Sequence, residues 1–288
     1  MKTTGHREEQ SMPKKKILTK CCSYIPLLLA CMISLFPFYW LINTSLQPLE
    51  SLFAWPPRMA PLLDPIRSYI GYVKNSNIVR WLLNTLLVAG VSTLVSTLAA
   101  IPAAYAFSRF RFRGRAFSTF LVLFTQMLPP VLLVIPIFII FSRLNLTNSL
   151  LGLILVNIAI TMPIGVWFLR GFFDTLPREL EESAVIDGCG VMGVLIRVLL
   201  PLLKPGLVAT ATWSFIIAWD EYLYAYTLLE SNQLWTASVG LASYMGQYST
   251  PWNEIMTGAA IATLPVLMMF AFFQKHLVGG LTGGAVKG

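Results

Sequence analysis

Long windows almost free of charged side chains constrain this chain more than any other feature. Six such windows are present: 21–49, 81–108, 116–142, 144–169, 205–229 and 255–274. Five contain no Asp, Glu, Lys or Arg, and the window 205–229 contains only Asp220 and Glu221. Each window holds the ~20 residues that an α-helix needs to cross the hydrocarbon core of a bilayer. The windows therefore predict a protein that crosses a membrane several times.

The composition supports this prediction. Charged residues make up 12% of the chain, apolar residues 56%, and the mean hydropathy is +0.68. A soluble domain has roughly 25% charged and roughly 45–50% apolar residues. These values exclude a disordered chain, a fibrous repeat and an ordinary soluble enzyme.

We expect an all-α, polytopic membrane protein with six transmembrane helices in a domain over residues 21–288, preceded by a tail, 1–20. The predicted helices are Ser23–Leu46, Thr85–Phe107, Phe117–Phe141, Leu150–Leu169, Gly206–Leu229 and Ile255–Gln274. Of the 21 Lys and Arg residues, 16 fall in the two terminal segments and in the second and fourth connections. Positive charge accumulates on the cytoplasmic side, so both termini should be cytoplasmic. The basic runs flank spans directly, which favours lipid headgroups over nucleic acid as their partner.

The chain lacks the motifs of common catalytic and energy-converting sites. It has no G-x-x-x-x-G-K-[ST] run and no G-x-S-x-G elbow, and its histidines and cysteines have no metal-ligand spacing. We therefore expect no enzyme activity, metal or cofactor in this chain, and an energy source on another chain.

The connection 170–205, on the predicted cytoplasmic side, is unusual for its length and composition. Thr175 or Asp174 is placed to cap a helix. The first turns of that helix hold three carboxylates, where the helix dipole favours anions: Glu179, Glu181 and Glu182.

Two glycines then interrupt this connection. Gly188 and Gly190 can adopt the left-handed conformation that ends a helix, and a second short helix is expected over Val191–Leu199. Ser183 and Ala184 would allow a soluble partner to approach the first helix closely. An amphipathic loop lying at the membrane interface, without a partner, is the alternative interpretation.

A spaced pattern in this connection resembles a known signature. Glu182-Ser183-Ala184, three residues, Gly188, nine residues, and Val198-x-Leu200-Pro201 resemble the E-A-A, G and I-x-L-P elements of ABC-importer permeases. Ser183 replaces the usual first alanine and Val198 the usual isoleucine.

The second half of the chain extends the resemblance to carbohydrate permeases of the maltose-permease type. Trp219-Asp220-Glu221-Tyr222 resembles the W-N-E-F run of that family, with Asp for Asn and Tyr for Phe. The last residues, 280–288, resemble its G-L-x-x-G-A-V-K-G terminus. The resemblance covers nearly everything after residue 20.

The resemblance implies a type I ABC-importer permease fold in the plasma (inner) membrane of bacterial type. It implies four kinds of partner: a second, different permease chain, two ATP-binding subunits that bind ATP and Mg²⁺, an extracytoplasmic solute-binding protein, and a carbohydrate such as an oligosaccharide or sugar derivative. The connection 170–205 would dock in an ATPase subunit. Its candidate residues are Glu181, Glu182, Ser183, Ala184, Asp187, Gly188 and Pro201.

Polar and aromatic residues in or beside the spans are candidates for the substrate pathway: Asn84, Gln126, Asn157, Trp219, Asp220, Glu221 and Tyr222. Hydrogen bonds between helices explain Asn84, Gln126 and Asn157 equally well. For Asp220 and Glu221, contacts at the outer interface beside an aromatic belt are the favoured alternative. An outer loop over 230–254 is expected to meet the binding protein, with candidates Tyr244, Gly246, Gln247 and Trp252. A cytoplasmic tail is expected over 275–288.

Two other functions remain open from the sequence. One is a self-sufficient carrier or channel in which Asp220 and Glu221 handle ions or protons, since intramembrane acids are usually functional. The other is an ABC permease for a non-sugar solute such as a polyamine. A carrier needs no docking helix, so the signature favours the ABC permease.

Overall fold

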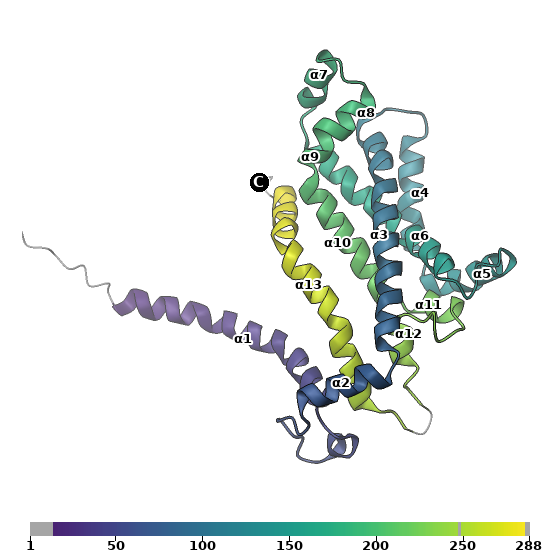
Figure 1. Ribbon diagram of the computed structural model, residues 1–288. Helices are drawn as coiled ribbons and strands as arrows, with labels where there is room; N and C mark the ends of the chain where they lie inside the picture. Colours follow the sequence, from purple (N-terminus) through teal and green to yellow (C-terminus); the bar gives the residue numbers. More distant parts are fainter. Residues whose placement is uncertain (1–13, 247–248, 286–288) are drawn as a thin grey trace, which may run out of the picture.

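The computed structural model describes the backbone of residues 14–246 and 249–285 and the side chains of residues 24–246 and 249–274. Within these ranges every regular element is a helix (Figure 1). The predicted all-α class is therefore confirmed.

Four helices are long and apolar enough to cross a membrane unbroken: α1 (Lys14–Ser45), α3 (Ile78–Arg109), α6 (Leu150–Thr175) and α13 (Trp252–Ala285). Two bent pairs supply the remaining passes. Helix α4 (Arg115–Met127) meets α5 (Pro130–Arg143) at 98°, and the segment Val191–Leu202 meets α10 (Lys204–Asp220) at 79°. The described chain thus has six passes when each bent pair is counted as one.

The third predicted span, Phe117–Phe141, is not a single helix. Helix α4 ends at Met127, and Leu128 has an extended backbone, with a φ of −77° and a ψ of 122°. Pro129 and Pro130 follow. A proline disfavours the helical conformation in the residue before it and has no N–H to continue the helix, so two in succession break the span.

The fifth predicted span, Gly206–Leu229, is also broken. Helix α10 ends at Asp220, Glu221 is extended, and a short helix, α11 (Leu223–Leu228), follows. The Glu221 carboxylate accepts hydrogen bonds from the backbone N–H groups of Tyr224, at 2.7 Å, and Ala225, at 2.9 Å. These bonds satisfy the first N–H groups of α11 and thereby favour a new helix start.

The chain ends differ from the expected boundaries. Helix α1 already begins at Lys14, inside the expected tail 1–20, and residues 1–13 lie outside the described part. The last helix continues to Ala285, where a tail over 275–288 was expected. Residues 286–288 lie outside the described part.

The centre of the bundle is formed by α3, α6 and α10, with α13 packed against α10 (Figure 1). These helices approach closely through small residues. A methyl group at Gly165 of α6 would lie 3.4 Å from the Cβ atom of Ala100 in α3 and 3.5 Å from the Cγ2 atom of Thr210 in α10. Small residues at such contacts let helix backbones pack tightly within a membrane.

Helix α1 leaves this bundle, and Figure 1 shows it extending away from the other helices. Its apolar window within Tyr24–Ser45 is not buried at all. Contact with the bundle is concentrated on α13, where the Thr257 hydroxyl donates a hydrogen bond of 3.3 Å to the carbonyl of Ser45. An apolar helix of membrane length therefore has little cover from the rest of the described chain.

Short helices close the two ends of the bundle. At the end beside the last turn of α1 lie η1 (Leu49–Phe53), α2 (Pro65–Asn75) and α12 (Ala237–Ala242). At the opposite end lie α7 (Glu179–Ile186), α8 (Val191–Gly193), the π-helical turn η2 (Val194–Leu199) and α9 (Leu200–Leu202) (Figure 1). The second short helix predicted for 191–199 is thus confirmed and continues to Leu202.

Candidate coupling loop and membrane path

The loop between α6 and α10 projects from one end of the molecule as a helical tip formed by α7 and α8 (Figure 1). Gly188 ends α7 with a φ of +87°, the left-handed conformation predicted for it. Gly190 instead has a φ of −74°, so only Gly188 needs the freedom of a glycine. A methyl group at Gly188 would meet nothing within 4 Å, so the constraint on this residue comes from its backbone conformation.

The start of α7 differs from the prediction. Thr175 and Asp174 belong to the end of α6, and α7 begins at Glu179 with Arg178 before it. The Thr175 hydroxyl donates to the carbonyl of Phe172, one turn back in its own helix. The expected caps therefore serve α6 and its neighbours rather than α7.

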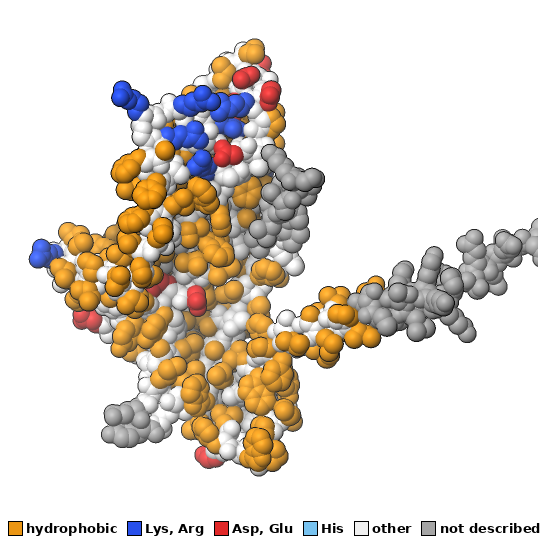
Figure 2. Space-filling view, turned by 180° about the vertical axis from the view of Figure 1, so that it is seen from behind, with side chains coloured by type: hydrophobic (Ala, Val, Ile, Leu, Met, Phe, Trp, Pro, Cys, Tyr) orange, Lys and Arg blue, Asp and Glu red, His pale blue; other side chains and the backbone are white. Residues whose placement is uncertain are grey.

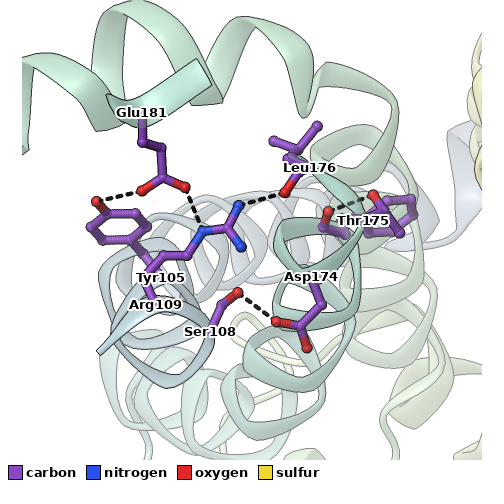
Figure 3. Close-up of polar contacts among 8 residues, drawn as sticks. Tyr105, Ser108, Arg109, Asp174, Thr175, Leu176 and Glu181 are labelled. Atoms are coloured by element: carbon purple, nitrogen blue, oxygen red, sulfur yellow. Dashed lines mark hydrogen bonds and ion pairs between the residues drawn. The ribbon is translucent and has the colours of Figure 1, made fainter. Parts of the chain in front are cut away.

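An ion pair fastens α7 to the end of α3 (Figure 3). The Arg109 Nε atom lies 2.5 Å from the Glu181 Oε1 atom, and these side chains are only 8% and 16% exposed. Tyr105, one turn earlier in α3, donates a hydrogen bond of 3.3 Å to Glu181. The same guanidinium donates to the carbonyl of Leu176 at 2.9 Å, so Arg109 bonds both to α7 and to the residue that ends α6.

A second contact joins α3 to α6 beside this ion pair (Figure 3). The Ser108 hydroxyl donates to the Asp174 carboxylate at 2.5 Å, and Arg170 lies 3.6 Å from the other oxygen of that carboxylate. The ends of the two central helices and the loop thus form one polar cluster.

The candidate residues of the tip divide into an inner and an outer set. Glu181 faces the bundle and Ala184 is buried in an apolar core with Phe173 and Leu199. The remaining tip candidates are exposed: Glu182, Ser183, Asp187 and Gly188. Pro201 lies in α9, just before the bend into α10.

The outer surface of the tip also carries apolar side chains that are not part of the signature. Val185 is 59% exposed, Ile186 85%, Val191 57% and Met192 63%. Large exposed apolar side chains gathered beside carboxylates are typical of a surface that another protein covers. Their signal in the sequence is an apolar pair, Val185-Ile186, that follows the carboxylates and small residues of the same helix.

The candidates for the membrane path do not form one site. The Asn84 amide donates to the carbonyls of Gln233 and Trp235, both at 2.9 Å, at the end of the bundle that carries α12. Asn157 is fully buried and donates to the carbonyl of Leu153 within its own helix.

Gln126 belongs to a different, largely apolar pocket of about 420 Å³ beside the break between α4 and α5. Its amide donates to the carbonyl of Ile160 in α6 at 3.2 Å.

Trp219 and Asp220 come together in a third place. They line a pocket of about 360 Å³ between α10, α12 and α13, with Ser238 and Thr263 on its walls. Asp220 is exposed and makes no ion pair with any described residue, whereas both oxygens of Glu221 accept hydrogen bonds from α11. Tyr222 is 41% exposed and stacks on Tyr226 at a ring distance of 5.5 Å.

The candidates for the outer loop are partly covered. Tyr244 packs edge-on against Trp81 at a ring distance of 6.2 Å. Gly246 is exposed in a tight turn, since a methyl group there would lie 2.6 Å from the carbonyl oxygen of Ser249. Trp252 is 37% exposed at the start of α13, and Gln247 lies outside the described residues.

The surface has two chemical zones. Figure 2 shows hydrophobic side chains over much of the visible face and Lys and Arg side chains gathered towards the end that carries α7. Helix α3 ends at Arg109 and α4 begins at Arg115 in that zone. Among the side chains that the structure describes, no three His, Cys, Asp or Glu residues are grouped as metal ligands.

Membrane-length helices packed through small residues, with a fastened helical tip at one end, define a multi-pass helical membrane protein. The chain belongs to the family of binding-protein-dependent transport system inner membrane components, whose model matches residues 93–282. It is therefore an inner-membrane permease component of a binding-protein-dependent transport system.

Several relatives cover most of the chain. The sulfoquinovosyl glycerol permease SmoH of Agrobacterium fabrum is 34% identical over 88% of this chain and 89% of its own. The trehalose/maltose permease MalG of Thermococcus litoralis is 31% identical over 96% of this chain and 99% of its own. The diacetylchitobiose permease DasC of Streptomyces coelicolor is 31% identical over 88% and 92%.

A solved structure has the same fold. A chain of a bacterial ABC transporter involved in the import of the acidic polysaccharide alginate superimposes with a TM-score of 0.73. The match covers 95% of this chain and 99% of that chain at 19% identity. The predicted ABC-importer permease fold is confirmed.

Proposed function

We propose that this chain forms half of the translocation path of an ATP-driven importer for a carbohydrate and transmits the ATPase cycle through its α7–α8 tip. The observation that carries the proposal is the geometry of the tip. Its inner face is fastened to α3 by Arg109 and Glu181, while its outer face presents carboxylates and uncovered apolar side chains. To transmit motion, the tip needs both a rigid attachment to the membrane helices and an exposed surface that a partner can bind.

The mechanism is a two-state rearrangement. When the ATPase subunits close around ATP and Mg²⁺, the docked tip moves with them, because its exposed residues lie against their surface. The ion pair and the apolar core around Ala184 transmit this motion to α3 and α6. The packing of these two helices sets the shape of the membrane path. Nucleotide chemistry takes place on the ATPase subunits, so this chain needs no catalytic residue or cofactor of its own.

The other half of the path comes from a second, different permease chain. Support comes from α1, whose apolar window is fully uncovered by this chain. A transmembrane helix gains little from hydrophobicity alone in lipid, and its packing depends on contacts with other helices. Helix α1 therefore extends to pack against the partner permease, with the tip and both termini on the cytoplasmic side, where Lys and Arg accumulate.

The substrate class is proposed from the relatives. Permeases for trehalose/maltose, diacetylchitobiose and sulfoquinovosyl glycerol are all similar to this chain over most of its length. Their shared chemistry is a sugar unit. A self-sufficient carrier that uses Glu221 gains no support, because hydrogen bonds to α11 occupy both of its carboxylate oxygens.

The test is purification of the chain from its native membrane in a mild detergent, followed by identification of every copurifying subunit. We expect a second permease and an ATP-binding subunit. A sugar-binding protein should also copurify when the extracytoplasmic proteins are retained during membrane isolation. Purified complexes reconstituted into liposomes should take up sugar only with ATP. Isolation of the chain alone, with uptake that needs no ATP, would overturn the proposal.

A further inference from the structure

A polar pocket lies at the end of the molecule opposite the α7–α8 tip, where α2 crosses the start of α13 (Figure 1). Its volume is about 290 Å³, near the lower end of the ~300–1000 Å³ typical of small-molecule sites. The pocket is separate from the pocket of Trp219 and Asp220 and from the pocket of Gln126.

Side chains that can form hydrogen bonds line this pocket, and several of them have no partner in the described part of the chain. They include Arg67, Asn75, Asn253 and Glu254. Within the described ranges, none of these four side chains takes part in a hydrogen bond or ion pair. A group of this kind offers both donors and acceptors, which matches a hydroxyl group, since a hydroxyl does both.

Tyr72 adds a buried hydroxyl to the wall. This residue is 9% exposed, and its hydroxyl is shielded from solvent without a hydrogen-bond partner among the described residues. A buried polar group without a partner costs about 1–3 kcal/mol. Burial, and after it the neighbouring Tyr244 hydroxyl, raises the pKa of Tyr72 above its ordinary value, which already leaves the hydroxyl protonated and able to donate at neutral pH.

Charge and aromatic content narrow the ligand further. The lining holds one basic side chain, Arg67, and one acidic side chain, Glu254, so their charges balance and favour a neutral ligand over a phosphate or an amine. Tyr244 supplies a half-buried ring at the wall, 6.4 Å from the ring of Tyr72. Aromatic rings with a polar tip provide an apolar face beside hydrogen-bonding groups.

We propose that this pocket binds one neutral hexopyranose ring at the outer face of the chain, before the sugar enters the membrane path. The proposal rests on the proposed function, because it takes the substrate to be a carbohydrate that arrives from the outer side. The ring hydroxyls bond to Asn75 and Tyr72, one ring face lies against Tyr244, and Asn253 lies on the wall of the pocket.

The test uses the complete complex in lipid nanodiscs, with the four native cysteines replaced by serine and a single new cysteine, N253C. The rate at which a thiol reagent labels this cysteine is measured with 100 mM glucose and with 100 mM betaine, a zwitterion without hydroxyl groups. We expect glucose to slow labelling at least threefold and betaine to leave it unchanged. A second cysteine, Q233C, lies outside the pocket and should react equally fast in both.

Gly71 provides a matched pair of variants that does not depend on Tyr72. It lines the pocket, and a methyl group there would meet nothing within 4 Å. G71A should therefore retain the protection by glucose, whereas G71F should fill the pocket and abolish it. Equal labelling of N253C with glucose and betaine would overturn the proposal, as would protection that only the solute-binding protein confers, which would make the pocket a protein-docking surface.

The same purified complex, reconstituted in parallel into liposomes in which uptake can be measured, separates this proposal from the proposed function. ATP-driven sugar uptake without protection of N253C would leave the importer standing and remove the site. Protection without any ATP-driven uptake would establish the site and remove the importer.

Discussion

Gly188 is the single residue whose conformation most directly shapes the tip. Its φ of +87° lies in the region where a side chain costs about 1–2 kcal/mol, and more for a β-branched residue. We expect G188V to reduce ATP-driven sugar uptake at least tenfold while the chain still assembles in the membrane. G190V is the matched control, because Gly190 has an extended backbone and should tolerate valine. Wild-type uptake by G188V would argue against a docking role for the tip.

Asp220 allows a second prediction at the same scale. Asp220 is exposed in its pocket and forms no ion pair with any described residue. Its charge therefore makes no stabilising ion pair within the described part of the chain. We expect D220N to keep uptake within about twofold of wild type, since asparagine keeps the shape and most of the hydrogen-bonding capacity. Complete loss of uptake in liposomes would instead make Asp220 a specific ligand or an ion site.

At the scale of elements, the contact between α3 and α7 is the connection on which the mechanism depends. Breaking a buried ion pair by removing one partner costs about 3–5 kcal/mol, because a charge is left buried and unpaired. R109M should therefore lower the thermal stability of the purified complex clearly and reduce uptake. R170M is the control, because the pair of Arg170 with Asp174 is looser, at 3.6 Å, and more exposed.

The double variant R109M/E181L separates stability from coupling. An apolar pair of similar volume should recover most of the lost stability, since no buried charge remains. Uptake per ATP hydrolysed should stay low, because the tip is no longer fastened to α3 by the ion pair. Full recovery of that ratio would show that the ion pair only stabilises the fold.

The break between α10 and α11 is the second element-scale feature. Glu221 accepts two backbone hydrogen bonds at the start of α11, and losing a helix cap of this kind costs about 0.5–2 kcal/mol. We expect E221A to destabilise the complex by that amount in thermal unfolding. E221Q should lose less, because one oxygen acceptor remains. Unchanged stability in both variants would contradict the capping role.

The number of membrane passes could be predicted from the sequence, but the breaks within two of the predicted spans could not. Charge-free windows depend only on composition, so six passes and the all-α class could be predicted from them. The break at Glu221 could not, because nothing in the sequence shows that both of its carboxylate oxygens accept hydrogen bonds from the backbone of α11. The signature likewise located the tip, but it could not reveal that Glu181 faces Arg109, since those residues lie 72 positions apart in the chain.

At the scale of the whole molecule, α1 is the part that this chain leaves uncovered. If a second permease covers α1, cysteines placed in turn at residues 27–30 should show helical periodicity in their reaction with a membrane-permeant thiol reagent. One face should be protected in the complete complex, because a partner helix lies against it. Uniform reaction at all four positions would contradict a partner on α1.

Cross-linking between the tip and the ATPase shows directly whether the tip docks on that subunit. A photoreactive benzoylphenylalanine at Ser183, which is exposed on α7, would be activated in native membranes, with the same amino acid at Gln233 on the opposite end as the control. We predict a covalent product with the ATP-binding subunit from position 183 and none from position 233. The absence of that product from position 183 in membranes that contain the assembled transporter would contradict docking of the tip on the ATPase.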